Sequence, residues 1–74
     1  MNTIEKIKVN SSAIKKAEYI LESEKMTVHF NDGGIYEYSY IPKFYWRGLY
    51  ESTSKGKFLN SFIFNRFPFN KITN

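Results

Sequence analysis

Cysteine is missing from this sequence and histidine occurs once, so two of the residue types that bind transition metals are nearly absent. Without thiols the chain has neither disulfides nor thiolate metal sites, and cysteine usage does not mark a redox compartment. A single histidine, His29, cannot supply a histidine-rich metal site. We therefore expect no metal ion and no cofactor.

The chain also lacks a long apolar run. No segment approaches the ~20 apolar residues of a membrane-spanning helix, and no signal-peptide core is present. These absences predict a cytoplasmic protein that has no membrane partner.

A catalytic constellation is the third absence. Acid–base and nucleophilic catalysis need a reactive side chain beside a partner, and the sequence shows no Ser/His/Asp pattern, no paired carboxylates and no metal-ligand spacing. His29 alternates with apolar neighbours in a predicted strand, so we expect it to face solvent. Asp32 lies in a predicted hairpin turn, where aspartate favours the turn geometry. We predict that the protein is not an enzyme.

Positive charge and aromatic rings are what the chain has in excess. Eleven Lys and Arg outnumber seven Asp and Glu, which gives a net charge of +4, and 19% of the residues are aromatic. The charge favours an anionic partner such as nucleic acid or a nucleotide, although surplus lysines also serve solubility alone. Because 74 residues bury only a small core, a homo-oligomer is a further source of stability, which the sequence leaves open.

The first half of the chain has the alternation of antiparallel strands. Apolar residues recur at every second position over 26–31 and tyrosines do so over 35–41, with an Asn-Asp-Gly-Gly hairpin turn between them. The earlier segment 13–22 also alternates. Within it Ile14 and Ile20 are out of step with the other apolar residues, which indicates a bulge or burial on both faces.

Two helical runs follow these strands. Pro42 ends the last strand, because proline has no N–H to donate to a sheet, and it can begin a helix over 42–52. Ser54 is the natural N-cap of a second helix over 55–67, whose apolar residues recur with helical spacing. Pro68 stops this helix.

These elements predict an α+β fold in a single domain of residues 1–74, with a core over about 9–67. The fold consists of a three-stranded antiparallel meander with two helices packed on one face, the strands at about 13–22, 26–31 and 35–41 and the helices at about 42–52 and 55–67. The short N-terminal arm is either a frayed tail or an edge strand. The C-terminal tail is ordered only if Phe69 finds a pocket.

The strongest candidate for a binding site is the loop Ser54-Lys55-Gly56-Lys57. A hydroxyl, a glycine and two ammonium groups at a helix N-terminus, where N–H groups are free, suit a phosphate-sized anion. Asn60 and Arg66 are candidates for further ligands. The P-loop spacing is absent, so nucleotide hydrolysis does not follow. The alternative is an N-cap with solvated lysines, but this does not explain Gly56, since glycine in a helix costs roughly 1 kcal/mol against alanine.

The tyrosine row of the third strand has two interpretations. If Tyr36, Tyr38 and Tyr40 are exposed, they form a platform on which bases can stack, as in proteins that bind single strands. If they are buried, they form the inner face of a sheet covered by the helices. We favour burial.

Trp46 in the first predicted helix is the other aromatic candidate. Lys43 and Arg47 lie on the same side of that helix, so the three residues suit base stacking or a partner interface with auxiliary positive charge. A tryptophan at the edge of the core, beside a solvated arginine, explains the pattern equally well.

Four short motifs follow one another over most of the chain, and they are Ser11-Ser12-Ala13-Ile14, Tyr36-Glu37-Tyr38, Ile41-Pro42 and Ser54-Lys55-Gly56-Lys57-Phe58-Leu59-Asn60. From about Val9 to Phe67 this order resembles the KTSC domain, a module named for its place at the C-terminus of some lysyl-tRNA synthetases and also found as a stand-alone bacterial or phage protein. The departure is at Leu59, where the family more often has a second aromatic residue. The family has no settled activity, and the resemblance implies RNA binding.

We therefore expect a non-enzymatic module that binds a phosphate-bearing ligand, either RNA or another single-stranded nucleic acid, or a nucleotide. The phosphate would lie in the Ser54–Lys57 loop and a base would pack on Trp46 or a tyrosine. One alternative is an oligomeric protein, in the host cytoplasm if phage-encoded, that sequesters a nucleotide signal in a closed pocket between protomers. Another is a protein-interaction module, for which the candidate aromatic residues are Phe44, Trp46, Phe64 and Phe69.

Overall fold

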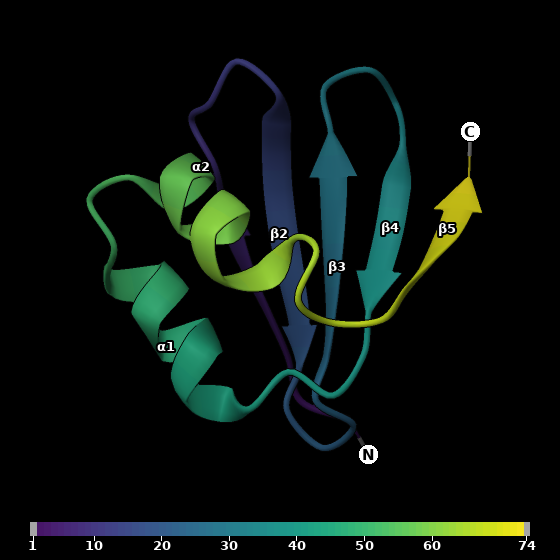
Figure 1. The fold of residues 1–74 in the computed structure, drawn as a ribbon. Coiled ribbons are helices and arrows are strands. Elements are labelled where there is room, and N and C mark those ends of the chain that lie inside the picture. The colour runs from purple at the N-terminus through teal and green to yellow at the C-terminus, as the bar shows by residue number, and fades with distance from the viewer. Residues whose placement is uncertain (1, 74) are drawn as a thin grey trace.

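A five-stranded antiparallel sheet with helices across one face makes up the computed structural model, which describes residues 2–73 (Figure 1). The strands are β1 (Ile4–Lys8), β2 (Ile14–Ile20), β3 (Lys25–Phe30), β4 (Ile35–Tyr38) and β5 (Phe69–Thr73). The helices are α1 (Lys43–Glu51), α2 (Lys55–Phe58) and the π-helical segment η1 (Leu59–Ile63). No helix within residues 2–73 is long and apolar enough to cross a membrane.

Each strand pairs with the next one along the chain, in the order β1-β2-β3-β4-β5, and the helices lie in the connection between β4 and β5. The predicted α+β class and antiparallel meander are therefore confirmed. The predicted count of three strands is wrong, because the N-terminal arm and the C-terminal tail form the two edge strands.

Both edge strands are held through cross-strand neighbours that lie far away in the sequence. In β1, Ile7 is opposite Ala17 of β2. In β5, Phe69 is opposite Tyr38 of β4, and their ring centroids lie 5.5 Å apart. These contacts order two segments that look too short and too polar to be strands when read alone.

The bulge expected in the first predicted strand is present. The register of β2 against β3 shifts between Ile14 and Lys16, so the extra residue turns Ile14 toward the helices together with Ala17 and Tyr19. Ile20 stays on the opposite face, where it is partly buried. The shift therefore brings Ile14 to the core side, whereas Ile20 is out of step because it lies on the other face of the sheet.

The second helical run ends earlier than the sequence indicates. The segment η1 stops at Ile63, Phe64 is already extended, and Asn65 has a φ of 65° in the left-handed region. The predicted end at residue 67 is therefore wrong. Asparagine accepts this backbone conformation more readily than most residues, and it reverses the chain before Pro68.

The core lies between the sheet and the helices, and it consists of apolar and aromatic side chains: Val9, Ile14, Ala17, Tyr19, Met26, Val28, Tyr38, Ile41, Trp46, Leu49, Leu59 and Ile63. The hydroxyl of Tyr19 donates a hydrogen bond of 2.6 Å to the carbonyl of Ile41, which satisfies the one polar atom of a fully buried ring. This bond joins β2 to the segment that leads into α1.

The two buried tyrosines predict loss of stability in alkali. Burial, with the nearby charge of Glu24, raises the pKa of Tyr19 from its ordinary value of 10.0 to about 12. Burial, with a smaller contribution from Tyr36, raises the pKa of Tyr38 to about 12 as well. Folding favours the neutral phenols, so their contribution to stability is complete below pH 10.0 and is lost as the pH rises toward 12.

Spectrophotometric titration of tyrosinate together with circular dichroism tests this expectation. Of the six tyrosines, the last to ionise are expected to do so as the fold is lost. Ionisation of all six near pH 10.0 with the fold intact would contradict the burial of Tyr19 and Tyr38.

Candidate anion-binding site

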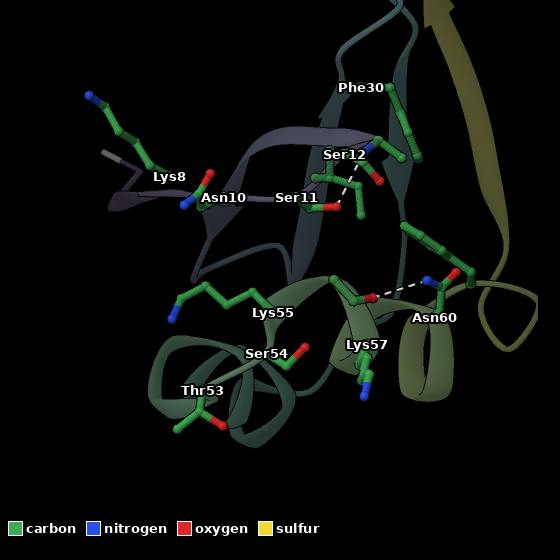
Figure 2. A pocket seen from close by; sticks show the side chains of 14 residues that line it. Lys8, Asn10, Ser11, Ser12, Phe30, Thr53, Ser54, Lys55, Lys57 and Asn60 are labelled. Carbon is green, nitrogen blue, oxygen red and sulfur yellow. Dashed lines mark hydrogen bonds between the residues drawn. The ribbon is translucent and has the colours of Figure 1, made fainter.

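A pocket of about 660 Å³ lies where the β1–β2 loop, the end of β3 and the segment around α2 meet (Figure 2). Its lining residues come from three parts of the chain, and they are Lys8, Asn10, Ser11, Ser12, Ala13, Ile14, Phe30, Thr53, Ser54, Lys55, Gly56, Lys57, Asn60 and Phe64. The predicted anion-binding loop thus forms one wall of this pocket.

Asn31 holds the β1–β2 loop in place from the hairpin that follows β3. Its side-chain amide donates to the carbonyls of Ser11 and Ser12, at 3.1 and 3.0 Å, and its backbone N–H donates to the carbonyl of Ala13 at 2.8 Å. Ala13 N–H donates to Ser11 Oγ at 3.3 Å. These bonds fix the backbone of the loop, and with it the serine wall of the pocket.

Gly56 allows α2 to approach that loop closely. A Cβ built on Gly56 would lie 3.2 Å from Ser11 Oγ and 3.4 Å from Ser11 Cβ, which is tighter than ordinary contact for the first of these atoms. A side chain at this position would therefore require Ser11 to shift by a few tenths of an ångström. Packing against Ser11 thus supplies a reason for a glycine in the first turn of α2 that does not require a ligand.

Three lysines border the pocket, and none of its lining residues within the described part of the chain is acidic. The side chains of Lys8 and Lys57 are exposed. Lys55 is partly buried, because its Nζ donates to the carbonyl of Ser52 at 2.9 Å, at the end of α1. With no carboxylate in the lining to neutralise them, the lysines make the pocket favourable for an anion.

The structure brings together five of the six predicted phosphate ligands, which are Ser54, Lys55, Gly56, Lys57 and Asn60. Ser54 occupies the N-cap position of α2, but its side chain makes no capping hydrogen bond. Asn60 donates from Nδ2 to the carbonyl of Gly56 at 3.1 Å. Arg66 is not part of the lining, because its Nε donates to the carbonyl of Ser61 at 2.8 Å, beyond the end of η1.

Sequence reasoning missed the half of the pocket that comes from other elements. Lys8 ends β1, Asn10 and the serine pair lie on the β1–β2 loop, and Phe30 ends β3. The Ser11-Ser12 motif was a usable signal, since two adjacent serines outside any predicted element need a structural or binding reason. No local pattern connects Lys8 or Phe30 to α2, because strand pairing and helix packing bring them there.

The burial that we favoured for the tyrosine row holds for Tyr38 and in part for Tyr36, but not for Tyr40. Tyr38 is 5% exposed and belongs to the core, Tyr36 is partly buried, and Tyr40 is 74% exposed beyond the end of β4. Tyr40 has a φ of 64°, so it leaves the alternation of the strand. The row is therefore broken into three different environments.

Trp46 lies at the edge of the core and not on an open surface. It is 5% exposed, its ring stacks on Tyr19 with centroids 5.2 Å apart, and its Nε1 donates to Glu5 Oε1 at 2.7 Å. Lys43 and Arg47 border a second pocket of about 720 Å³ beside it, which is also lined by Glu5 and Glu51. These carboxylates make the second pocket mixed in charge and less suited to an anion.

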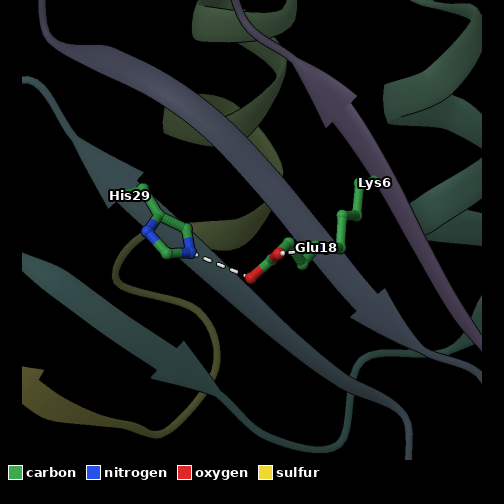
Figure 3. A network of polar contacts seen from close by, with 3 residues as sticks. All are labelled: Lys6, Glu18 and His29. Carbon is green, nitrogen blue, oxygen red and sulfur yellow. Dashed lines mark hydrogen bonds and ion pairs between the residues drawn. The ribbon is translucent and has the colours of Figure 1, made fainter. Parts of the chain in front are cut away.

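His29 lies on the sheet face opposite the helices but faces solvent less than expected. Its side chain is 19% exposed, because its Nε2 lies 2.9 Å from Glu18 Oε1, while Lys6 Nζ lies 3.6 Å from Glu18 Oε2 (Figure 3). Burial opposes ionisation of Glu18, but the hydrogen bond and charge of His29 together with Lys16 and Lys6 outweigh it and lower the pKa of Glu18. Within residues 2–73, no group of three or more His, Cys, Asp or Glu side chains could hold a metal ion.

Comparison with known proteins identifies a domain family and two relatives. The KTSC domain profile matches residues 10–67. A lysine–tRNA ligase of Nostoc punctiforme is 31% identical over 67 residues, which is 90% of this chain and 12% of the ligase, and a lysine–tRNA ligase of Trichormus variabilis is 28% identical over the same shares. The chain therefore spans about an eighth of the length of these curated relatives.

A solved structure has the same fold. The crystal structure of a KTSC domain protein from Yersinia pestis superposes with a TM-score of 0.86 at 25% sequence identity, and the match covers 96% of this chain and all of that one. The meander with helices between its last two strands is thus shared over nearly the whole length of both proteins.

The Trp46–Glu5 hydrogen bond leads to a stability prediction. Replacing Glu5 with alanine removes the acceptor of a nearly buried indole N–H, and we expect the free energy of unfolding to fall by about 1–2 kcal/mol. Glu5→Gln keeps an amide oxygen at the same distance along the side chain and is expected to stay close to the parent protein. Urea unfolding followed by the fluorescence of the single tryptophan measures both. Equal stability of the alanine and glutamine variants would show that the bond contributes nothing.

Proposed function

This chain belongs to the KTSC domain family, and on that premise we propose that it is a non-enzymatic module that binds RNA or another single-stranded nucleic acid through its phosphates. The observation that carries the proposal is the pocket between the β1–β2 loop and α2, which is bordered by three lysines and, among the described lining residues, no carboxylate. The ligand is recognised by the ammonium groups and by the hydroxyl and amide groups between them.

The chemistry of the lining suits phosphate oxygens. Lys8 and Lys57 carry exposed ammonium groups, and the hydroxyls of Thr53 and Ser54 lie on the same wall as Lys57. Phosphate contacts of this kind release counterions from the nucleic acid, so they supply affinity that falls as salt rises. The net charge of +4 adds a general attraction for the same partner.

The similarity to lysine–tRNA ligases supports RNA as the ligand. The name of these enzymes describes the attachment of lysine to tRNA, and the matched segment makes up 12% of the ligase from Nostoc punctiforme. If the matched ligase segment has the same lysine-bordered pocket as this chain, it is suited to adding contacts to an RNA. For a stand-alone chain the same contacts would bind RNA in the cytoplasm.

Sequestration of a nucleotide signal is the alternative proposal. It requires that a second protomer covers the pocket, because most side chains that line the pocket within one chain are exposed. The protein-interaction proposal loses support, since Trp46 is buried and Phe64 is partly buried, while Phe44 and Phe69 are 66% and 51% exposed on different elements. An open pocket suits a strand that passes across it.

The double variant Lys8→Ala/Lys57→Ala tests the proposal. Both side chains are exposed, so we expect little change in stability, but binding of a short single-stranded RNA should weaken about tenfold at low salt. The slope of log affinity against log salt should become shallower by about 1–2. Lys55 is left in place because its bond to the Ser52 carbonyl gives it a structural role.

The matched control is Lys25→Ala/Lys43→Ala, which lowers the net charge by the same amount. These lysines lie at the opposite end of the sheet, where they pair with Glu37 and Glu24 at 3.6 and 3.9 Å. Fluorescence anisotropy with one labelled RNA compares all three proteins. An equal loss of RNA affinity in both double variants would show that binding depends on overall charge. An unchanged affinity in Lys8→Ala/Lys57→Ala would show that the pocket does not bind the RNA.

A further inference from the structure

We propose that the pocket takes a nucleotide with an unpaired base, and that this base packs against Phe30 and Phe64 while the lysines hold its phosphate. The inference rests on the proposed function and goes beyond it, because it names the chemical unit that the site recognises. It also assigns base stacking to Phe30 and Phe64 instead of Trp46 and the tyrosines, which were the candidates in the sequence.

The aromatic wall of the pocket is a pair of phenylalanines from distant parts of the chain. Phe30 is the last residue of β3, and Phe64 follows η1 directly. Their ring centroids lie 5.7 Å apart, both rings line the pocket, and both side chains are partly buried. The pair therefore presents apolar ring surface to the same cavity as the lysines.

Contacts with the core hold the two rings in place. Phe30 meets Tyr36 edge to face at 5.4 Å between centroids, and Phe64 stacks on Tyr38 at 5.5 Å. Each ring is thus fixed by aromatic neighbours and also lines the pocket. Rings that are already fixed lose little conformational freedom when a ligand packs on them.

The lysines border the same pocket from other elements, and in Figure 2 the side chains of Lys8 and Lys57 extend outward from its rim in different directions. In Figure 2, Phe30 lies on the side of the pocket away from Lys8 and Lys55, with the serines between them. The volume of about 660 Å³ lies in the range of about 300–1,000 Å³ that is usual for pockets that bind small ligands. The pocket is therefore large enough for a unit that has both a flat apolar part and an anionic part.

The aromatic pair and the lysines together select among phosphate-bearing ligands. A bare phosphate would leave the phenylalanine surface in water, and a duplex keeps its bases stacked and paired inside the helix. An unpaired nucleotide suits both, since every base has a face that stacks on an aromatic ring. Asn60 commits its Nδ2 to the Gly56 carbonyl, so its amide oxygen remains an acceptor beside the site.

The experiment compares a short single-stranded RNA with an abasic strand of equal length and equal phosphate number. For the parent protein we expect the abasic strand to bind about tenfold more weakly, which is the size of effect that stacking of one base produces. Phe64→Leu and, separately, Phe30→Leu keep apolar volume but remove the ring, so each should reduce the difference between the two strands.

Phe67→Leu is the matched control, because Phe67 is also partly buried but packs against Tyr45 and does not line the pocket. It should keep the full preference for the intact strand. Lys8→Ala/Lys57→Ala should lower the affinity for both strands by the same factor. This result would distinguish the phosphate contacts from the base contact. The comparison of the intact RNA with the abasic strand uses only the parent protein, so this test does not depend on whether a variant folds.

The outcomes separate this inference from the proposed function. Equal binding of the intact and abasic strands by the parent protein would overturn the base site and leave phosphate binding in place. If neither strand bound, both the base site and the proposed nucleic-acid binding would be wrong. Preference for the intact strand supports the inference, and competition by a free nucleoside monophosphate then tells whether the nucleotide is recognised alone or only within a strand.

Discussion

The pocket depends on a close approach between α2 and the β1–β2 loop, where Gly56 packs against Ser11. A Cβ at this position would come within 3.2 Å of Ser11 Oγ, and the loop has little freedom to retreat because Asn31 bonds to the carbonyls of Ser11 and Ser12. This contact sets the distance between two walls of the pocket. The lysines of α2 and Lys8 thereby border a common space although they are far apart in the sequence.

The local sequence pattern was sufficient to predict the elements whose structure is determined by residues close in the sequence. The meander from β2 to β4, the helix at α1 and the lysine loop before α2 were all visible as periodicity and turn chemistry. Strand β1 was only one of two alternatives for the N-terminal arm, because charged residues separate Ile4 from Ile7, and β5 was not predicted, because the tail is short. Their stability comes from cross-strand partners that only the fold supplies.

The same distinction explains the candidate site. Ser54, Lys55, Gly56, Lys57 and Asn60 form one local cluster and could be found together, whereas the serine and phenylalanine walls are assembled by long-range pairing. Trp46 was ambiguous in the sequence because its hydrogen-bond partner Glu5 is 41 residues away. Burial of the tyrosine row was wrong for Tyr40, because β4 ends at Tyr38 and leaves Tyr40 outside the strand's alternation.

Backbone NMR during titration with a short single-stranded RNA tests the central claim most directly, because it locates the ligand without assuming its contacts. The account predicts that shift changes cluster on the β1–β2 loop, on Phe30, on residues 53–57 and on Asn60, which line one pocket. It also predicts that the changes diminish as salt is raised. Changes confined to α1 around Trp46 and Arg47, or the absence of any change at low salt, would contradict it.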